Sequence, residues 1–409
     1  MLLNRSRATE IMERENIDAM VAALPINFYY LSDYWGLFNT PGGYDGAYMA
    51  LLPKHENAEP ALIVPALELR RVVTKSTWIQ TVHGFSSPAD ELAADGVLQG
   101  VPYTGWLPRE GADLSELEQR WVNIVAEKGG QVAANAFWAL ARAIREAGLE
   151  SARIATDEPR LQSWLAACGL NDIRCEYRVD LFNETRLVKT PDEIALLKTA
   201  ARINEDALLA AADSMRVGAT WQEIESVYMT EMAKQGGRGV YLMCGVGELP
   251  NREIRQGEPV LFDALGQYEH YHGDFGRCVV VGEPTAEHRQ RHQAIFTGWE
   301  AAQEWLKPGV RYSEVSSAVG KVIRQAGFSG FRDPIVHSLG LEHTDDPKPP
   351  GVQPQDKPDQ TLLEGMVVNV DMPHTELGWG SVHMEDTVTI TAGGCERLTS
   401  ADFGLRIVR

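Results

Sequence analysis

The sequence has no long apolar run, no closely spaced cysteine pairs and no excess of basic residues. No stretch of about 18 apolar residues occurs, so a membrane-spanning helix is not expected. The N-terminal segment lacks the apolar core and the small-residue cleavage site of a secretory signal, and its pattern is typical of a helix. The five cysteines are scattered, which argues against a cysteine zinc site and favours reduced thiols in a cytoplasm.

The charge balance is strongly acidic, with a net charge of −19. Phosphate groups would be repelled, so nucleic acid is not expected as a partner. The acidic residues are spread along the chain and form no acidic tail. A chain of 409 residues is long for a single hydrophobic core and indicates two domains.

The first part of the chain alternates strand and helix patterns. Short apolar segments at 47–53 and 60–66 are bounded by turn residues and predict strands. The amphipathic segment 135–148 ends at a glycine and predicts a helix. We therefore expect a smaller α/β domain over residues 1–185.

One stretch of this first domain, residues 28–48, is rich in aromatic residues and contains the sequence TPGG. We interpret it as a loop that closes over a ligand, with a loop packed on the core as the alternative. Trp35 and Tyr44 are the candidate substrate-binding residues of this stretch.

The second part of the chain has a different pattern. Thr190 and Pro191 have the N-cap and first-position chemistry of a long amphipathic helix. Apolar strand segments dominate after residue 239, with a helical stretch at about 286–327 between them. Strands mixed with paired helices predict an α+β domain over residues 186–409.

Four acidic residues and one histidine of this domain lie in apolar strand settings. Asp263 and Asp274 are far enough apart for a hairpin to bring both to one place, and His337, Asp371 and Glu385 follow in later strands. A lone buried carboxylate is costly, whereas several are tolerated around a cation. Each residue alone is more often a turn cap than a ligand. Together, carboxylates and one imidazole suit Mn, Fe, Co or Zn.

These residues carry a resemblance to a known family. The segments FDALGQYEHYHGDFGR, HSLG, LEGMVVNVD and HMEDTVTITAGGCERLT resemble the motifs of the pita-bread family, which includes methionine aminopeptidase, aminopeptidase P, prolidase and creatinase. The linker ETRLVKTPDEIALLKTAARI and the segment IDAMVAALPINFYYLSDYWG resemble the creatinase and prolidase members. The resemblance covers most of the chain. It implies an α+β pita-bread catalytic domain preceded by a smaller creatinase-like α/β domain.

The resemblance also implies ligands and partners. Asp263, Asp274, His337 and Glu385 fall on the metal-ligand positions, and two divalent ions with a shared hydroxide would be the family's mechanism. Family members with this N-terminal domain are usually homodimers. Residues 35–48 could then line the pocket of the partner subunit.

Three positions depart from the family pattern. Asp371 stands where the family has Glu, so its side chain is one methylene shorter. His343 lies one residue before the position of a substrate-contacting histidine of the peptidases, which Thr344 occupies here. In an extended strand this shift would turn the side chain to the other face, unless a bulge restores it.

The third departure is His383, which replaces an arginine that the peptidases often carry. Strand periodicity places it on the same face as Glu385, as a proton shuttle, a replacement ligand or a packed strand residue. His272 shares a face with Asp274 and is a further substrate-binding candidate, with a plain hairpin residue as the alternative.

These patterns leave three functions open. The first is a metal-dependent hydrolase of an amide C–N bond in a small substrate or Xaa-Pro dipeptide, with His343 and His383 as catalytic candidates; a metal-free enzyme like creatinase ranks lower. The second is a lyase acting on a small zwitterion, similar to the dimethylsulfoniopropionate lyase of this fold, with aromatic residues holding a cation. The fold also includes an ectoine hydrolase. The third is a binding protein without catalysis.

Overall fold

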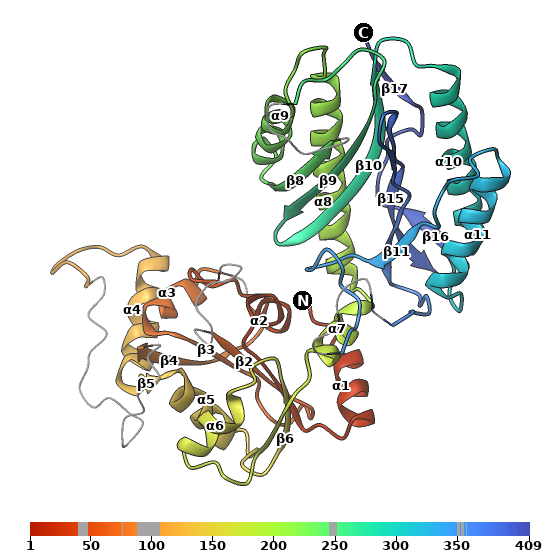
Figure 1. The fold of residues 1–409 in the computed structure, drawn as a ribbon. Helices are drawn as coiled ribbons and strands as arrows, with labels where there is room; N and C mark the ends of the chain where they lie inside the picture. The colour runs from red at the N-terminus through yellow and green to blue at the C-terminus, as the bar shows by residue number, and fades with distance from the viewer. Residues whose placement is uncertain are drawn as a thin grey trace. The chain divides into compact units, whose positions relative to one another are not determined.

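The computed structural model describes residues 1–39, 48–75, 77–87, 107–244, 252–349, 352, 356 and 358–409. Tertiary contacts divide the chain into two compact units (Figure 1). Unit 1 comprises Met1–Arg186 and Pro349–Gly351, and unit 2 comprises Leu187–Lys348 and Val352–Arg409. No helix in the described part of the chain combines the length and the apolar character needed to cross a membrane.

Unit 1 is built on a mixed sheet of seven strands in the order β5-β4-β3-β2-β1-β6-β7. The strands are β1 (Ala19–Ala22), β2 (Met49–Pro53), β3 (Ala61–Pro65), β4 (Thr81–Ser87), β5 (Ala133–Asn135), β6 (Arg153–Thr156) and β7 (Arg174–Tyr177). The central β2 is antiparallel to both neighbours, and the outer pairs are parallel. Parallel neighbours require crossover connections, and helices provide them.

The helices of unit 1 are α1 (Arg5–Arg14), α2 (Pro25–Ser32), α3 (Leu69–Val72), α4 (Glu116–Lys128), α5 (Ala136–Glu146), α6 (Leu161–Ala167) and α7 (Val179–Leu187). The N-cap Asn135 accepts hydrogen bonds from the backbone N–H groups of Phe137 and Trp138, so α5 begins directly after β5. The apolar face of α5 is buried against the sheet and forms the main core of the unit.

The interpretation of residues 28–48 as one ligand-closing loop is wrong for its first part. Pro25 is the first residue of helix α2, which continues through Tyr29 and Tyr30. Tyr34 and Tyr48 are buried, and the Tyr34 hydroxyl donates a hydrogen bond to Glu68 at 2.5 Å. These rings are therefore core residues and offer no open face to a cation. Residues 40–47 lie outside the described part of the chain.

Unit 2 is built on a sheet of eight strands with the main path β11-β12-β15-β10-β9-β8, extended by β16 beside β15 and β17 beside β10. These strands are β8 (Arg238–Cys244), β9 (Pro259–Tyr268), β10 (Tyr271–Val281), β11 (Ile335–Ser338), β12 (Val367–Asp371), β15 (Glu385–Thr391), β16 (Gly394–Arg397) and β17 (Arg406–Val408). A separate small hairpin pairs β13 (His374–Glu376) with β14 (Gly380–Val382).

Two pairs of helices flank this sheet (Figure 1). They are α8 (Pro191–Asp213) with α9 (Trp221–Lys234), and α10 (Ala286–Trp305) with α11 (Tyr312–Gln325). The first pair shares one apolar core with β8, β9 and β10, and the second shares another with β12 and β15. Thr190 caps α8 as predicted, in a reciprocal capping box with Glu193.

The predicted hairpin between Asp263 and Asp274 is present. Strands β9 and β10 pair along their whole length, and Glu269 and His270 form the tight turn with positive φ angles of 45° and 69°. Positive φ at both central residues matches the right-handed twist of a two-residue hairpin. The turn therefore fixes the register that places both aspartates.

Candidate metal centre

The carboxylates of the predicted set meet on one face of the unit 2 sheet. Across four neighbouring strands, Asp263 lies opposite Gly276, Gly276 opposite Glu385, and Glu385 opposite Asp371. Asp274 precedes Gly276 by two residues on β10, and a spacing of two returns a strand side chain to the same face. Strand pairing alone therefore brings four carboxylates together.

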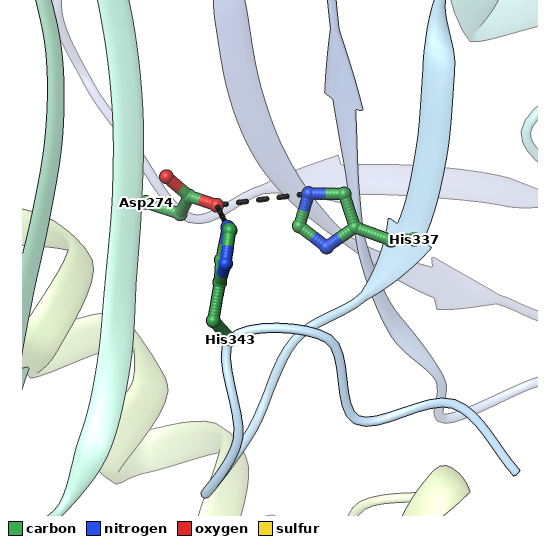
Figure 2. Close-up of side chains that lie close together, drawn as sticks. All are labelled: Asp274, His337 and His343. Atoms are coloured by element: carbon green, nitrogen blue, oxygen red, sulfur yellow. Dashed lines mark ion pairs between the residues drawn. The ribbon is translucent and has the colours of Figure 1, made fainter. Parts of the chain in front are cut away.

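Two histidines approach the same carboxylate from different elements (Figure 2). His337 belongs to β11, and its Nε2 lies 3.7 Å from Oδ2 of Asp274. His343 belongs to the following loop, and its Nε2 lies 3.1 Å from the same oxygen. The two imidazole rings are nearly perpendicular, with centroids 5.0 Å apart. The histidines six residues apart thus converge on Asp274.

His383 is completely buried between acceptors. Its Nε2 lies 2.7 Å from Oδ1 of Asp371 and 3.4 Å from Oε2 of Glu385, and its Nδ1 lies 3.1 Å from the carbonyl oxygen of Phe262. Both ring nitrogens thus face oxygen atoms that can accept a hydrogen bond, an arrangement that favours the doubly protonated imidazolium. Burial lowers the pKa of His383, but the bond to Asp371 more than offsets this, and the net pKa is raised.

The position of the His383 ring depends on Gly276. An ideal Cβ atom at Gly276 would overlap the imidazole of His383, with Nε2 only 2.8 Å away and two other ring atoms closer. Gly276 is also the strand residue that lies between Asp263 and Glu385. The absence of a side chain here leaves the space that His383 fills.

The carboxylates strongly perturb one another. Burial, followed by the neighbouring charges, raises the pKa of Asp263 to about 7 and raises that of Glu385 well above its usual range. Burial acts in the same direction on Asp274, but the contact with His343 outweighs it and lowers the pKa. Correspondingly, Asp274 raises the pKa of His343 against the effect of burial. Such crowding is costly without a compensating cation.

The donor set fits a divalent cation. Oε2 of Glu385 and Oδ1 of Asp274 are buried without a hydrogen-bond partner among the described residues, whereas Oδ2 of Asp274 faces Nε2 of His343 at 3.1 Å. Ligand atoms lie within 4.8 Å of one another in three groups: Asp274, His337 and His343; Asp371, His383 and Glu385; and Asp263, Asp274 and Glu385. Asp274 and Glu385 each belong to two groups, as expected of residues placed between adjacent cation positions. Carboxylates with imidazole suit Mn, Fe, Co or Zn.

The other predicted site residues are placed as follows. His272 is buried on β10, and its ring nitrogens contact Gln267 Nε2 at 2.8 Å and the Gly340 carbonyl at 3.1 Å. These contacts engage both ring nitrogens of His272. Substrate binding by His272 stays a prediction. Trp35 packs edge-on against Tyr29 in unit 1, and its substrate role also stays a prediction. Tyr44 lies outside the described residues.

Sequence reasoning missed two residues of this centre. Asn369 Nδ2 donates a hydrogen bond of 2.8 Å to Oε1 of Glu385, and its position two residues before Asp371 in a strand was an available signal. Tyr241 of β8 lies near the carboxylates: burial raises the pKa of its phenol, and Asp263 raises it further. The pairing of β8 with β9 shifts register between Gly239 and Tyr241. Strand periodicity in the sequence therefore does not predict on which face of the sheet the Tyr241 side chain lies.

The fold and the donor set define a two-domain protein with a buried candidate centre for divalent cations in its second domain. Comparison with known families gives the same assignment. Residues 195–392 match the model of metallopeptidase family M24, and residues 5–122 match the creatinase/prolidase N-terminal domain. The chain therefore belongs to the pita-bread metallopeptidases with a creatinase-type N-terminal domain. The expected fold, an α+β catalytic domain after a smaller α/β domain, is confirmed.

Individual relatives are distant. A Xaa-Pro dipeptidase of Pyrococcus furiosus is 28% identical over 235 residues, which is 54% of this chain and 66%, slightly under two thirds, of the relative. The prolidase structure from P. furiosus aligns with a TM-score of 0.67 and 21% identity over 96% of this chain and 99% of that chain. A Xaa-Pro dipeptidase structure from Bacillus anthracis aligns with a TM-score of 0.70 and 19% identity over 99% of both chains. At these identities the structures establish the fold alone.

Proposed function

We propose that the protein is a metal-dependent hydrolase of amide-type C–N bonds in small substrates, with Xaa-Pro dipeptides as the first class to test. The observation that carries this proposal is the convergence of Asp263, Asp274, Asp371, Glu385 and His337 on one face of the sheet. The names of the relatives, Xaa-Pro dipeptidase and prolidase, support the choice of substrate class.

The residues of the centre have distinct tasks in this proposal. A divalent cation held by the carboxylates and His337 would acidify a water molecule and polarise the scissile carbonyl. Asp274 and Glu385 each belong to two of the ligand groups, so they would hold the cation and its water against the substrate. His343 is partly exposed and has a raised pKa, so its Nε2–H is suited to donate to the departing nitrogen.

The proposal includes an altered surrounding of the centre, for which His383 is the first candidate. His383 holds Asp371 and Glu385 by its Nε2 atom. An imidazolium in this position adds one positive charge beside the carboxylates. It therefore competes with a second cation for Asp371 and Glu385, and we expect this competition to set whether one or two ions bind. Manganese is the first ion to supply.

The proposal is tested by turnover. Purified protein is supplied with Mn²⁺, Co²⁺ or Zn²⁺ and incubated with Xaa-Pro dipeptides, and proline release is measured beside matched Xaa-Ala dipeptides. We expect metal-dependent release that falls at least about 1000-fold in Asp274→Asn, because charge stabilisation at the scissile carbonyl is lost. The control is His288→Gln, a buried histidine of α10 that lies outside the three ligand groups.

Other outcomes would change the assignment. Metal binding without release of proline, combined with mass-spectrometric detection of an alkene product from small zwitterions, would replace hydrolysis by a lyase reaction. Purified protein that holds no stoichiometric metal and shows no turnover would favour a binding protein. We also propose a homodimer in the cytoplasm, and light scattering of the purified protein would measure its mass.

A further inference from the structure

The loop that presents His343 is closed on itself. Its first residue, Ser338, is the last residue of β11 and directly follows His337. The backbone N–H of Asp345 donates to the Ser338 carbonyl at 3.1 Å, and the Ser338 N–H donates to both carboxylate oxygens of Asp346 at 3.2 Å. Residues 338–346, here named the His343 loop, therefore return to the end of the strand that carries His337.

Two neighbouring acids anchor the end of this loop in the interior. The Tyr312 hydroxyl donates a hydrogen bond of 3.0 Å to Oδ1 of Asp346. Asp345 forms an ion pair with Lys189, with 3.0 Å between Nζ and Oδ2, and the two side chains are 0% and 1% exposed. An ion pair shielded from water in this way is screened little by solvent, so it holds its partners in a defined geometry.

Lys189 is itself held in place. Its backbone N–H donates to the Gly365 carbonyl at 2.9 Å, and it lies directly before the N-cap of α8. Its ammonium also interacts favourably with the buried Glu193, whose pKa is raised to about 7 mainly by burial and lowered in part by Lys189. Lys189 thus connects the start of the long helix to the His343 loop.

Gly340 adds an independent geometric argument. A Cβ atom at this position would overlap the carboxylate of Asp345 and lie 2.9 Å from Nζ of Lys189. The Gly340 carbonyl accepts hydrogen bonds from the backbone and is within 3.1 Å of the ring of His272 on β10. The ion pair therefore packs against the inner surface of the loop, on the segment between His337 and His343.

We propose that Lys189 is a positioning residue of the candidate centre: through Asp345 it fixes the His343 loop, so that Nε2 of His343 is held against Asp274. This inference rests on the proposed function for its activity readout only. Lys189 lies about 150 positions from His343 in the sequence and outside the ligand set. Its influence on the centre is transmitted by the loop.

The test compares single and double variants. Lys189→Met leaves Asp345 buried without its ion-pair partner, and Asp345→Asn leaves Lys189 in the same condition. The double variant removes both charges of the ion pair, so neither partner remains buried opposite a missing charge. For each protein, the thermal midpoint, kcat/KM and the visible absorption spectrum of the Co²⁺-loaded centre are measured. The spectrum reports the geometry at Asp274 and needs no substrate.

We expect Lys189→Met to lower kcat/KM about 100-fold, the loss typical of a displaced group. The double variant should regain most of the thermal midpoint but not kcat/KM or the wild-type spectrum. Adding His343→Ala to Lys189→Met should cause no further loss, because both changes remove the same contact. The control is Asp157→Asn, which changes a buried carboxylate of unit 1 that accepts a hydrogen bond from Asn27. Its effect on kcat/KM should add to that of His343→Ala.

Recovery of kcat/KM and spectrum together with thermal stability in the double variant would overturn the proposal, because Lys189 would then be structural only. Additive losses in Lys189→Met and His343→Ala would also overturn it. If the wild type turns over none of the peptides, the proposed function fails, whereas an altered Co²⁺ spectrum in Lys189→Met would still support the positioning role.

Discussion

Replacing Gly276 by alanine tests the central packing of the site. The new methyl group would occupy space that the buried ring of His383 fills, so the ring must move away from Asp371 and Phe262. Overpacking costs about 1–3 kcal/mol. Leaving a buried imidazole without its acceptors costs about 1–3 kcal/mol more. We therefore expect unit 2 to lose roughly 2–6 kcal/mol, or about 4–24 °C in its melting temperature.

The measurement is differential scanning calorimetry in EDTA, so that metal binding does not contribute. Gly330→Ala is the matched control, because a Cβ at Gly330 would meet nothing within 4 Å. It should be neutral or slightly stabilising, by up to about 1 kcal/mol. The double variant Gly276→Ala/His383→Ala should recover stability lost by the single change, since the clash is gone. A Gly276→Ala protein that melts within 1 °C of the wild type would refute the described packing of His383.

Three further predictions concern charge at the centre. Asp274→Asn should abolish tight metal binding and also destabilise the metal-free protein by about 1–3 kcal/mol, because the charged Asp274 is held by His343 and its pKa is lowered in the folded state; elemental mass spectrometry and EDTA melts measure the two effects. The pKa of Asp263 is raised from 3.8 to about 7, so the folded state binds the proton more tightly and the metal-free protein should lose on the order of 2–4 kcal/mol as pH rises from 4 to 7. Urea unfolding across that window should show this decline in wild type and a weaker one in Asp263→Asn, and an identical slope would count against the shift. His383→Ala should increase the metal bound per chain, because a positive charge beside Asp371 and Glu385 is removed; a decrease would mean that His383 is itself a ligand.

Much of this centre follows from local sequence rules. The spacing between Asp263 and Asp274 suits a tight hairpin, and strand periodicity predicts that His383 and Glu385 share a face. Helix α8 begins where Thr190 and Pro191 predict its start. These features depend on neighbours in the sequence, so a periodic pattern is enough to predict them.

Other features depend on contacts that no local pattern records. The strand argument for His343 does not apply, because residues after Ser338 leave the strand and the loop turns the imidazole towards Asp274. The aromatic composition of residues 28–48 predicts a loop, whereas Pro25 starts a helix and the rings that follow are buried by tertiary packing. The partnership of Lys189 and Asp345 joins distant segments and has no signature in either one.

The arrangement of the carboxylates across β9, β10, β15 and β12 has a consequence for how the protein folds. Asp263 and Glu385 become neighbours only after the strands between them have paired, so a cation cannot gather its ligands early. Pairing between segments so far apart in sequence is slow, since a large loop must close first. Added metal should therefore slow unfolding and leave the refolding rate of unit 2 nearly unchanged. In a cell, such a protein would take up its cation as a last step, after the sheet is complete.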